Sequence, residues 1–98
     1  MTTFNRNDLK EQFKCLKILT KVNLSKKNIE RIEENTFNDL KRVFSINLSN
    51  NQIKFLQANA FNDIPRLSDI NLSANQLSDL DSAIFSTNTE LNRIFSEK

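Results

Sequence analysis

Hydrophobic and polar positions along this chain repeat with a period of 24 residues. The stretch 67–85 matches 43–61 and 19–37 when the sequence is shifted by one or two periods. Self-similarity at a fixed period of this size indicates a repeat architecture, in which each unit packs against its neighbours. We therefore expect three full repeats, at residues 19–42, 43–66 and 67–90.

Each repeat contains one step in which two apolar residues flank a single polar residue. These steps are Val22/Leu24, Ile46/Leu48 and Ile70/Leu72. Alternation with a period of two predicts a short strand in each repeat. The apolar residues that follow are spaced by three and five positions, so the rest of the repeat must curve back and stack on that strand.

The N-terminal segment predicts a short amphipathic helix at residues 8–17. Asp8 is the expected N-cap, and Glu11 three residues later completes a capping box. One face carries apolar residues at helical spacing, namely Leu9, Phe13 and Leu16. This helix is expected to cap the first repeat, while residues 1–7 are expected to be loosely held. Cys15 lies next to the apolar face, and we expect a small buried or half-buried thiol.

The C-terminal segment 91–98 admits two interpretations. Leu91 and Ile94 are in register for a fourth strand, although Ser96 stands where its second leucine belongs. Alternatively, residues 87–90 form a capping box that starts a helix. We favour an incomplete strand that acts as a cap.

The repeats contain the motif L-x-x-L-x-L-x-x-N-x-L, at residues 67–77 and, with valine and isoleucine at its ends, at 43–53. With its 24-residue period and a phenylalanine at the nineteenth position, the chain resembles the "typical" class of the leucine-rich repeat family over about residues 9–95. The resemblance implies one α/β domain over residues 1–98, a short solenoid arc with parallel strands on its concave face. It also implies an irregular or 3-10 convex side. The cysteine-rich caps common in extracellular members are missing.

The resemblance also bears on location, because this class occurs mostly in secreted proteins and receptor ectodomains. We therefore expect a secreted or extracellular fragment, although the polar stretch 2–10 is no signal peptide.

Two positions depart from the family motif. Its asparagine turns inward and satisfies backbone groups of adjoining turns, a role that Asn51 and Asn75 can play. The first repeat has Lys27 at this position, and a lysine cannot be buried without a large cost. We expect a looser first turn, or a Lys27 side chain that escapes at the open end. Asn88 departs in a second way, because it stands where a leucine is expected.

Composition argues against catalysis and against metal or cofactor binding. The 98 residues include no His, Gly, Trp or Tyr and a single cysteine, Cys15. Without His the commonest general base and a leading metal ligand are missing, and without Gly there is no Gly-rich phosphate loop. Apolar runs are too short for a membrane-spanning helix, so no membrane insertion is expected.

The polar residues of the strands are the candidate binding site. They face away from the core on the concave surface and are Lys21, Asn23, Ser25, Ser45, Asn47, Ser49, Asp69, Asn71 and Ser73. Arg93, Phe95 and Glu97 would join them on a fourth strand. The result is a ladder of asparagines beside a ladder of serines, which favours a polar recognition surface. Repeat duplication without a ligand on this face is the alternative. The three Asn-Leu-Ser sequons in the strands are interpreted as by-products of the repeat.

A second group of residues is basic. Lys10, Lys14, Lys17, Lys26 and Lys27 crowd the N-terminal end together with Lys21. They suggest a site for a sulfated glycan, an anionic lipid headgroup or a phosphate, with a solvated lysine face as the alternative. The net charge is only +2 and no nucleic-acid partner is expected.

Three phenylalanines fall outside the core pattern, namely Phe44, Phe55 and Phe95. Exposed aromatics at the ends of a short repeat stack favour self-association, for example as a homodimer. The alternative is that Phe44 and Phe55 cover flanking core. The sequence as a whole predicts a non-catalytic protein-interaction module and does not identify its partner. An anion-binding module and a structural fragment of a longer solenoid are the alternatives.

Overall fold

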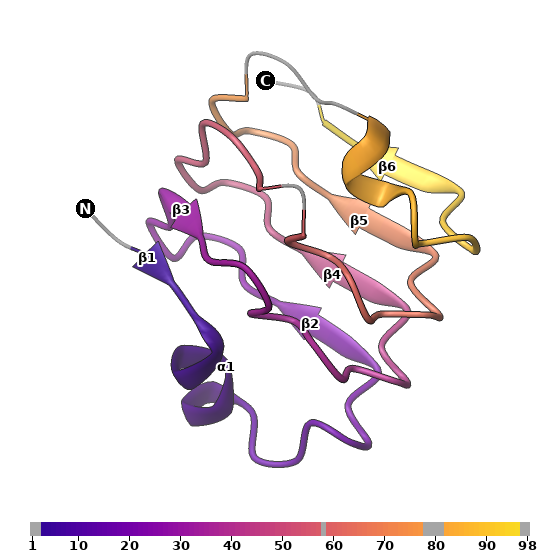
Figure 1. Ribbon diagram of the computed structural model, residues 1–98. Helices are drawn as coiled ribbons and strands as arrows, with labels where there is room; N and C mark the ends of the chain where they lie inside the picture. Colours follow the sequence, from indigo (N-terminus) through magenta and orange to yellow (C-terminus); the bar gives the residue numbers. More distant parts are fainter. Residues whose placement is uncertain (1–2, 58, 78–81, 97–98) are drawn as a thin grey trace.

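The computed structural model describes residues 3–57, 59–77 and 82–96. In chain order its elements are β1 (Thr3–Phe4), α1 (Arg6–Gln12), β2 (Lys21–Asn23), β3 (Arg31–Ile32), β4 (Ser45–Asn47), β5 (Asp69–Asn71), the 3-10 helix η1 (Ser82–Phe85) and β6 (Arg93–Phe95). Helix content is low, and most of each repeat is turn or irregular chain. Figure 1 shows β2, β4, β5 and β6 side by side in one layer.

These four strands form a parallel sheet in the order β2-β4-β5-β6. The register is constant, because Val22 pairs with Ile46, Ile46 with Ile70, and Ile70 with Ile94. Each partner thus lies 24 residues further along the chain, which is the period of the hydrophobic pattern. The chain between successive strands of this sheet, at residues 24–44, 48–68 and 72–92, forms what we call the return segments. Parallel strands joined by such long connections make this an α/β repeat arrangement. Of the two interpretations of the C-terminal segment, the structure has the strand. Glu97 lies outside the described residues.

The core runs through all the turns of the chain behind this sheet. Its central feature is a stack of four phenylalanine rings, Phe4, Phe37, Phe61 and Phe85. The ring centroids of Phe37 and Phe61 are 5.6 Å apart with the rings 6° from parallel, and those of Phe61 and Phe85 are 5.5 Å apart. Offset stacks of this kind add to the free energy gained by burying the rings. Phe4 is buried at the end of the stack, so the expectation of a loosely held N-terminal segment is wrong for this residue.

Two buried asparagines hold adjacent turns together. Asn51 Oδ1 accepts from the N–H groups of Lys27 (2.9 Å) and Ile29 (3.0 Å), and its Nδ2 donates to the carbonyls of Leu24 and Leu48 (both 2.9 Å). Asn75 has the same role in the following repeat. Its Oδ1 accepts from Ile53 N–H (3.0 Å), and its Nδ2 donates to the carbonyls of Leu48 and Leu72 (both 2.9 Å). The Leu48 carbonyl is therefore shared by both asparagines.

Lys27 stands at the corresponding position of the first repeat, and its side chain is exposed, as expected. The turn around it also differs in its backbone. Lys26, Asn50 and Ala74 occupy equivalent positions in the turn after each strand and all have positive φ. In the first repeat this turn has a second such residue, Asn28 (φ 58°), whereas the equivalent residues Gln52 and Gln76 are not in this region. An inward asparagine is missing there, and the turn adopts another path.

The N-terminal helix begins earlier and is shorter than expected. α1 begins at Arg6, and its N-cap is Asn5, whose Oδ1 accepts from Asp8 N–H at 3.0 Å. Asp8 is the third helical residue and not the N-cap, because its carboxylate reaches back to Asn5 N–H at 3.0 Å. Phe13 is already extended and ends the helix.

Beyond that end, Phe13 and Leu16 still pack against the core, partly buried. Cys15 is exposed, so the expectation of a buried or half-buried thiol is wrong. The reason is its place in the repeat. Cys15 is 24 residues before Asp39 and 48 before Asp63, and both of these residues are exposed in the turn.

Candidate functional site

The outward residues of the sheet form two rows that run across the strands. We call them together the strand face. The first row is Lys21, Ser45, Asp69 and Arg93, and the second is Asn23, Asn47, Asn71 and Phe95. Residues at the outer strands β2 and β6 are exposed, whereas those of β4 and β5 are half-buried between their neighbours.

The serines behind the second row do not form an outward ladder. Ser49 is only 6% exposed, so the expectation that it faces outward is wrong. Ser25 and Ser73 are half-buried. Each serine turns back to the asparagine two residues earlier in its own repeat. The Oγ of Ser49 donates to Asn47 Oδ1 at 2.7 Å, and the Ser49 N–H donates to the same oxygen at 3.0 Å.

The same pair of bonds recurs in all three repeats. Ser25 donates to Asn23 Oδ1 from N–H (3.1 Å) and from Oγ (2.8 Å), and Ser73 donates to Asn71 Oδ1 at 3.0 and 2.6 Å. A backbone N–H can only donate, so the atom it meets must be the amide oxygen, and this fixes the orientation of each amide. In each repeat the asparagine Oδ1 therefore already accepts two hydrogen bonds from the serine of the same repeat.

The Nδ2 atoms of these asparagines remain available. Among the described residues, no hydrogen-bond acceptor meets the Nδ2 of Asn23, Asn47 or Asn71. The three amides are in register on strands about 4.8 Å apart. They form a row of hydrogen-bond donors, which we call the amide ladder.

The first row contains charged residues on β2, β5 and β6, on both sides of the uncharged Ser45 of β4. Ser45 Oγ donates to Asp69 Oδ1 at 2.6 Å, which orients that carboxylate across the sheet. Lys21 Nζ lies 5.7 Å from the centroid of the Phe44 ring, a cation–π contact at the edge of β2. Arg93 stands beside Asp69 in the pairing of β5 with β6. The row thus carries a positive charge on each outer strand and a negative charge on β5.

The basic residues singled out in the sequence do not form one surface. Lys10, Lys14 and Lys17 line a common hollow, which also contains Arg6. Lys27 lines a different hollow, beside the carboxylates of Asp8 and Glu11. Sequence reasoning missed Arg6 because it lies before the helix that the sequence predicts. It is the first residue of α1.

The three phenylalanines outside the core pattern also lie apart. Phe44 is 38% exposed, and Phe55 and Phe95 are each 50% exposed. Phe44 and Phe55 each lie beneath a cation of the chain, Lys21 for the first and Arg31, whose Cζ is 5.2 Å from the ring centroid, for the second. Phe95 has no such cation among the residues that the structure describes.

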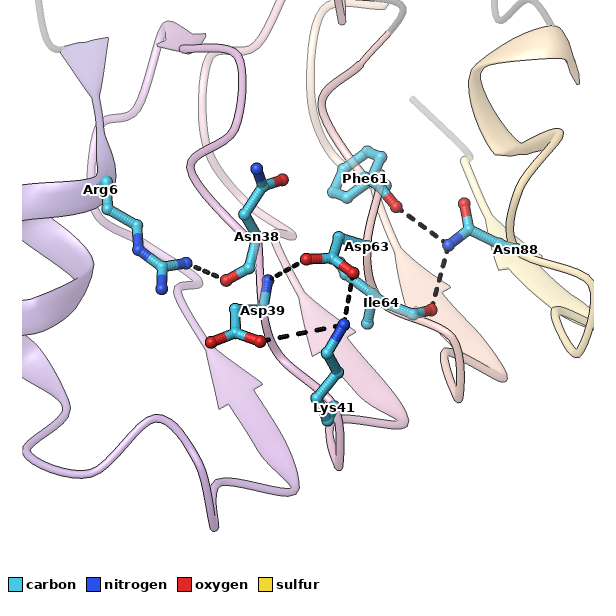
Figure 2. Close-up of polar contacts among 8 residues, drawn as sticks. All are labelled: Arg6, Asn38, Asp39, Lys41, Phe61, Asp63, Ile64 and Asn88. Carbon is cyan, nitrogen blue, oxygen red and sulfur yellow. Dashed lines mark hydrogen bonds and ion pairs between the residues drawn. The ribbon is translucent and has the colours of Figure 1, made fainter.

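A polar cluster on the return segments ties the first two repeats together (Figure 2). Asp63 Oδ2 accepts from Asp39 N–H at 2.8 Å, and Asp63 Oδ1 accepts from Lys41 Nζ at 2.6 Å. The bond from Lys41 and the bond from Asp39 N–H hold the pKa of the Asp63 carboxyl below its ordinary value. The bond to Asp63 raises the pKa of Lys41. Sequence reasoning missed this cluster, although its members are spaced by about one period.

Asn88 also joins two neighbouring repeats, in this case through a buried side chain. Its side chain is buried, and Nδ2 donates to the carbonyls of Phe61 (3.0 Å) and Ile64 (3.3 Å), as Figure 2 shows. Its Oδ1 is buried without a hydrogen-bond partner in the described part of the chain. An asparagine at this leucine position therefore serves the backbone of the preceding repeat.

Other classes of site find little support in residues 3–57, 59–77 and 82–96. Within these ranges, no three His, Cys, Asp or Glu side chains gather so that they could hold a metal ion. No helix among these residues has the length and apolar character needed to cross a membrane.

Comparison with known proteins places the repeats in a family. The family model described as leucine rich repeat matches residues 17–77, which is 61 of the 98 residues. Searches of curated proteins and of solved structures gave no match.

Proposed function

Because the chain belongs to the leucine-rich repeat family, we propose that it is a protein-interaction module that binds its partner through the strand face. Domains of this family generally mediate protein interaction and are typically not enzymes. On this proposal, repeats 19–42, 43–66 and 67–90 form one short arc whose concave side is the strand face. α1 covers the front of the arc.

The observation that supports this proposal is the amide ladder. The oxygens of Asn23, Asn47 and Asn71 are occupied by their own serines, so the outward chemistry of the ladder is that of donors alone. A partner segment that presents backbone carbonyls or carboxylates would satisfy these donors. Lys21 and Arg93 at the two ends of the first row add positive charge and favour an acidic partner.

Replacing Asn47 by aspartate tests the ladder with little disturbance of the fold. One oxygen of the new carboxylate still accepts both bonds from Ser49, while the outward Nδ2 donor becomes a charged acceptor. We expect Asn47→Asp to keep the circular dichroism spectrum of the wild-type chain and to lose capture of the partner from the native source. A neutral carbonyl partner loses a donor, and an acidic partner also meets a like charge.

The matched control is Asn59→Asp. Asn59 is exposed in a return segment, and its Oδ1 accepts from Asn62 Nδ2 at 3.0 Å, a bond that aspartate also keeps. This variant carries the same charge change away from the strand face and should capture the partner like the wild-type chain. Undiminished capture by Asn47→Asp would show that the partner binds elsewhere.

The outer edge of β6 favours a second candidate function, pairing with another copy of the chain. Ile94 is 44% exposed, and its neighbour Phe95 is 50% exposed. Arg93 N–H donates to Ser68 O, and Phe95 O accepts from Leu72 N–H, so both residues direct their backbone groups toward β5. The N–H and C=O of Ile94 therefore face outward, because these groups alternate along a strand.

An antiparallel pair centred on Ile94 would be self-complementary. Ile94 would exchange two hydrogen bonds with Ile94 of the second copy, and Arg93 would lie opposite Phe95 of that copy. Cation–π pairing of this kind already occurs twice within the chain. The paired strands are only three residues long, so we expect a weak dimer.

A charge exchange tests this pairing by sedimentation equilibrium. Arg93→Glu should weaken the dimer by about tenfold, because a carboxylate replaces the cation opposite Phe95. Adding Phe95→Arg should restore it, because the new glutamate of one copy then faces the new arginine of the other. A dimer that ignores both changes, or a chain that stays monomeric at millimolar concentration, would contradict the pairing.

A further inference from the structure

A hollow of about 390 Å³ opens between α1 with its following turn and the first return segment. Four cationic side chains line it, namely Arg6, Lys10, Lys14 and Lys17. Asp39 supplies a carboxylate, and Phe13 and Leu16 supply apolar surface. We call it the basic hollow. Its volume falls within the range of small-molecule sites in proteins, which is about 300–1,000 Å³.

Among the residues that line the hollow, four are cationic and one, Asp39, carries a carboxylate. Arg6 directs its guanidinium at the carbonyls of Thr36 and Asn38, which are neutral acceptors. The carboxylate of Asp39 lies 3.8 Å from Nζ of Lys41, a lysine outside the hollow (Figure 2). Like charges gathered on one wall raise the local positive potential, and an anion that enters the hollow lowers their mutual repulsion.

The reason for the opening can be found in the repeat itself. One repeat later, the Asp63 carboxylate joins the equivalent segments by accepting from Asp39 N–H and Lys41 Nζ. Moved back by 24 residues, those bonds would join Asp39 to Cys15 N–H and Lys17 Nζ. In the described residues Asp39 makes neither bond. The chain after α1 therefore does not close against the first repeat, and the basic hollow is left between them.

The apolar part of the lining distinguishes this site from a bare anion site. Phe13 and Leu16 are half-buried and pack on the core, so each leaves part of its side chain at the wall of the hollow. A hydrated phosphate ion would leave that surface in water. A ligand with a hydrocarbon body would cover it and gain roughly 25 cal/mol for each Å² of apolar surface removed from water.

We propose that the basic hollow binds a small amphipathic anion, with its charged head among Lys10, Lys14 and Lys17 and its apolar body against Phe13 and Leu16. The head is a carboxylate, sulfate or phosphate, and the body is aliphatic or aromatic. The site is separate from the strand face, so it stands or falls independently of the protein-binding function proposed above.

The single cysteine provides a direct readout. Cys15 is exposed and lines the basic hollow, so a bound ligand should shield its thiol from a neutral alkylating reagent such as iodoacetamide. The probe is decanoate, below its micelle concentration. It is compared with decanol, which lacks the charge, and with inorganic phosphate, an anion that lacks the apolar body. We expect decanoate to slow alkylation in a saturable manner, at least tenfold more effectively than either compound. Higher salt should weaken its effect.

Two pairs of lysine variants locate the site. Lys10→Gln with Lys14→Gln removes two cations of the hollow and should weaken decanoate binding by tenfold or more. Lys26→Gln with Lys54→Gln removes the same charge from exposed lysines that do not line the hollow, and should leave binding unchanged. Equilibrium dialysis with Cys15→Ser verifies that decanoate binds and does not merely slow the reagent.

Equal protection by phosphate would overturn the apolar half of the proposal, and equal protection by decanol would overturn the anionic half. Binding that survives Lys10→Gln with Lys14→Gln would place the ligand elsewhere and overturn the site. Capture of the protein partner is expected to be unaffected by these lysine changes. Loss of decanoate binding and loss of partner capture are therefore distinguishable failures.

Discussion

The sharpest test of the repeat stack concerns the two buried asparagines that share one acceptor. Asn51 and Asn75 both donate from Nδ2 to the Leu48 carbonyl, each at 2.9 Å. In the described part of the chain this carbonyl has no other donor. A variant that removes one asparagine leaves the carbonyl satisfied by the other. Removing both leaves a buried acceptor without any partner.

The expected loss in the free energy of unfolding follows from the number of buried backbone groups that each substitution leaves without a hydrogen bond. Asn51→Ala leaves Ile29 N–H and Leu24 C=O without their side-chain partner, and both residues are buried. Lys27 N–H also loses its acceptor, but Lys27 is exposed and water can replace the bond. An unsatisfied buried group costs about 1–3 kcal/mol, so Asn51→Ala should lower the free energy of unfolding by about 2–6 kcal/mol.

Asn75→Ala should cost a similar amount, because it leaves Ile53 N–H and Leu72 C=O unpaired. The double variant adds the Leu48 carbonyl to these four groups. We therefore expect it to be less stable than the sum of the single effects by about a further 1–3 kcal/mol, the cost of one more unsatisfied group.

The cycle is measured by urea unfolding followed by far-ultraviolet circular dichroism, since the chain has no Trp or Tyr for fluorescence. Domains of this size have about 5–15 kcal/mol of stability, so all four proteins are measured in the same concentration of trimethylamine N-oxide to keep the double variant folded. Asn51→Ala with Asn59→Ala is the control cycle and should be additive. Additivity within about 0.5 kcal/mol at Asn51 and Asn75 as well would refute the shared acceptor.

Three further predictions concern single positions. Ala74 has φ 57° where the equivalent residue of the second repeat is Asn50, so Ala74→Asn should raise the free energy of unfolding by up to about 1 kcal/mol in urea titrations, and Asn50→Ala should lower it. Asn5→Ala should lower it by about 1 kcal/mol by removing the N-cap of α1, whereas Glu11→Ala should leave it nearly unchanged; equal effects would restore Asp8 as the cap. The pKa of Asp63 is lowered in the fold, so its contribution is complete above the ordinary aspartate pKa and is lost as the pH falls through the lowered value. The melting temperature of Asp63→Asn should thus lie slightly below that of the wild-type chain at pH 7 and converge with it below about pH 4, and a constant gap would contradict the ion pair.

The sheet and the core could be predicted from the sequence because both follow the strict 24-residue period of the apolar residues. The steps Val22/Leu24, Ile46/Leu48 and Ile70/Leu72 can bury their apolar residues only if the polar residue between them faces outward. Any shift of register would exchange the two sets. The same reasoning placed the asparagines of the strand face correctly on the outside.

The ends of the chain were harder to predict, because local signals there compete. Asn5/Asp8 and Asp8/Glu11 are both spaced by three residues, and each fits a capping box. The structure selects the first. Phe4 and Leu9 are both buried and stand in the positions of a hydrophobic staple around that cap. The spacing of Phe4 and Leu9 is visible in the sequence. It favours the cap at Asn5 only because Phe4 is buried in the phenylalanine stack, which the sequence alone did not indicate. Beyond the shorter helix, Cys15 takes the exposed position of Asp39 and Asp63 in the repeat. Because the helix also begins earlier, Arg6 is its first residue.

The polarity of the strand face could be predicted, but its donor character could not. Asparagine followed two residues later by serine favours a local hydrogen bond from serine to the asparagine side chain. Whether that bond forms depends on where the strand ends, since the serine must turn back toward the amide. The three strands end at Asn23, Asn47 and Asn71, and this makes the same bond possible three times.

Asn88 shows why a departure from a repeat pattern need not be a defect. The return segment of the first repeat is held from outside, where Asp63 accepts from Asp39 N–H and Lys41. One repeat later the residue equivalent to Asp63 is Thr87, which has no carboxylate to offer. The next residue, Asn88, instead reaches inside and donates to the carbonyls of Phe61 and Ile64. A leucine at this position would bury more apolar surface but would leave both carbonyls without these donors. The asparagine therefore packs less well but binds the backbone of the neighbouring turn.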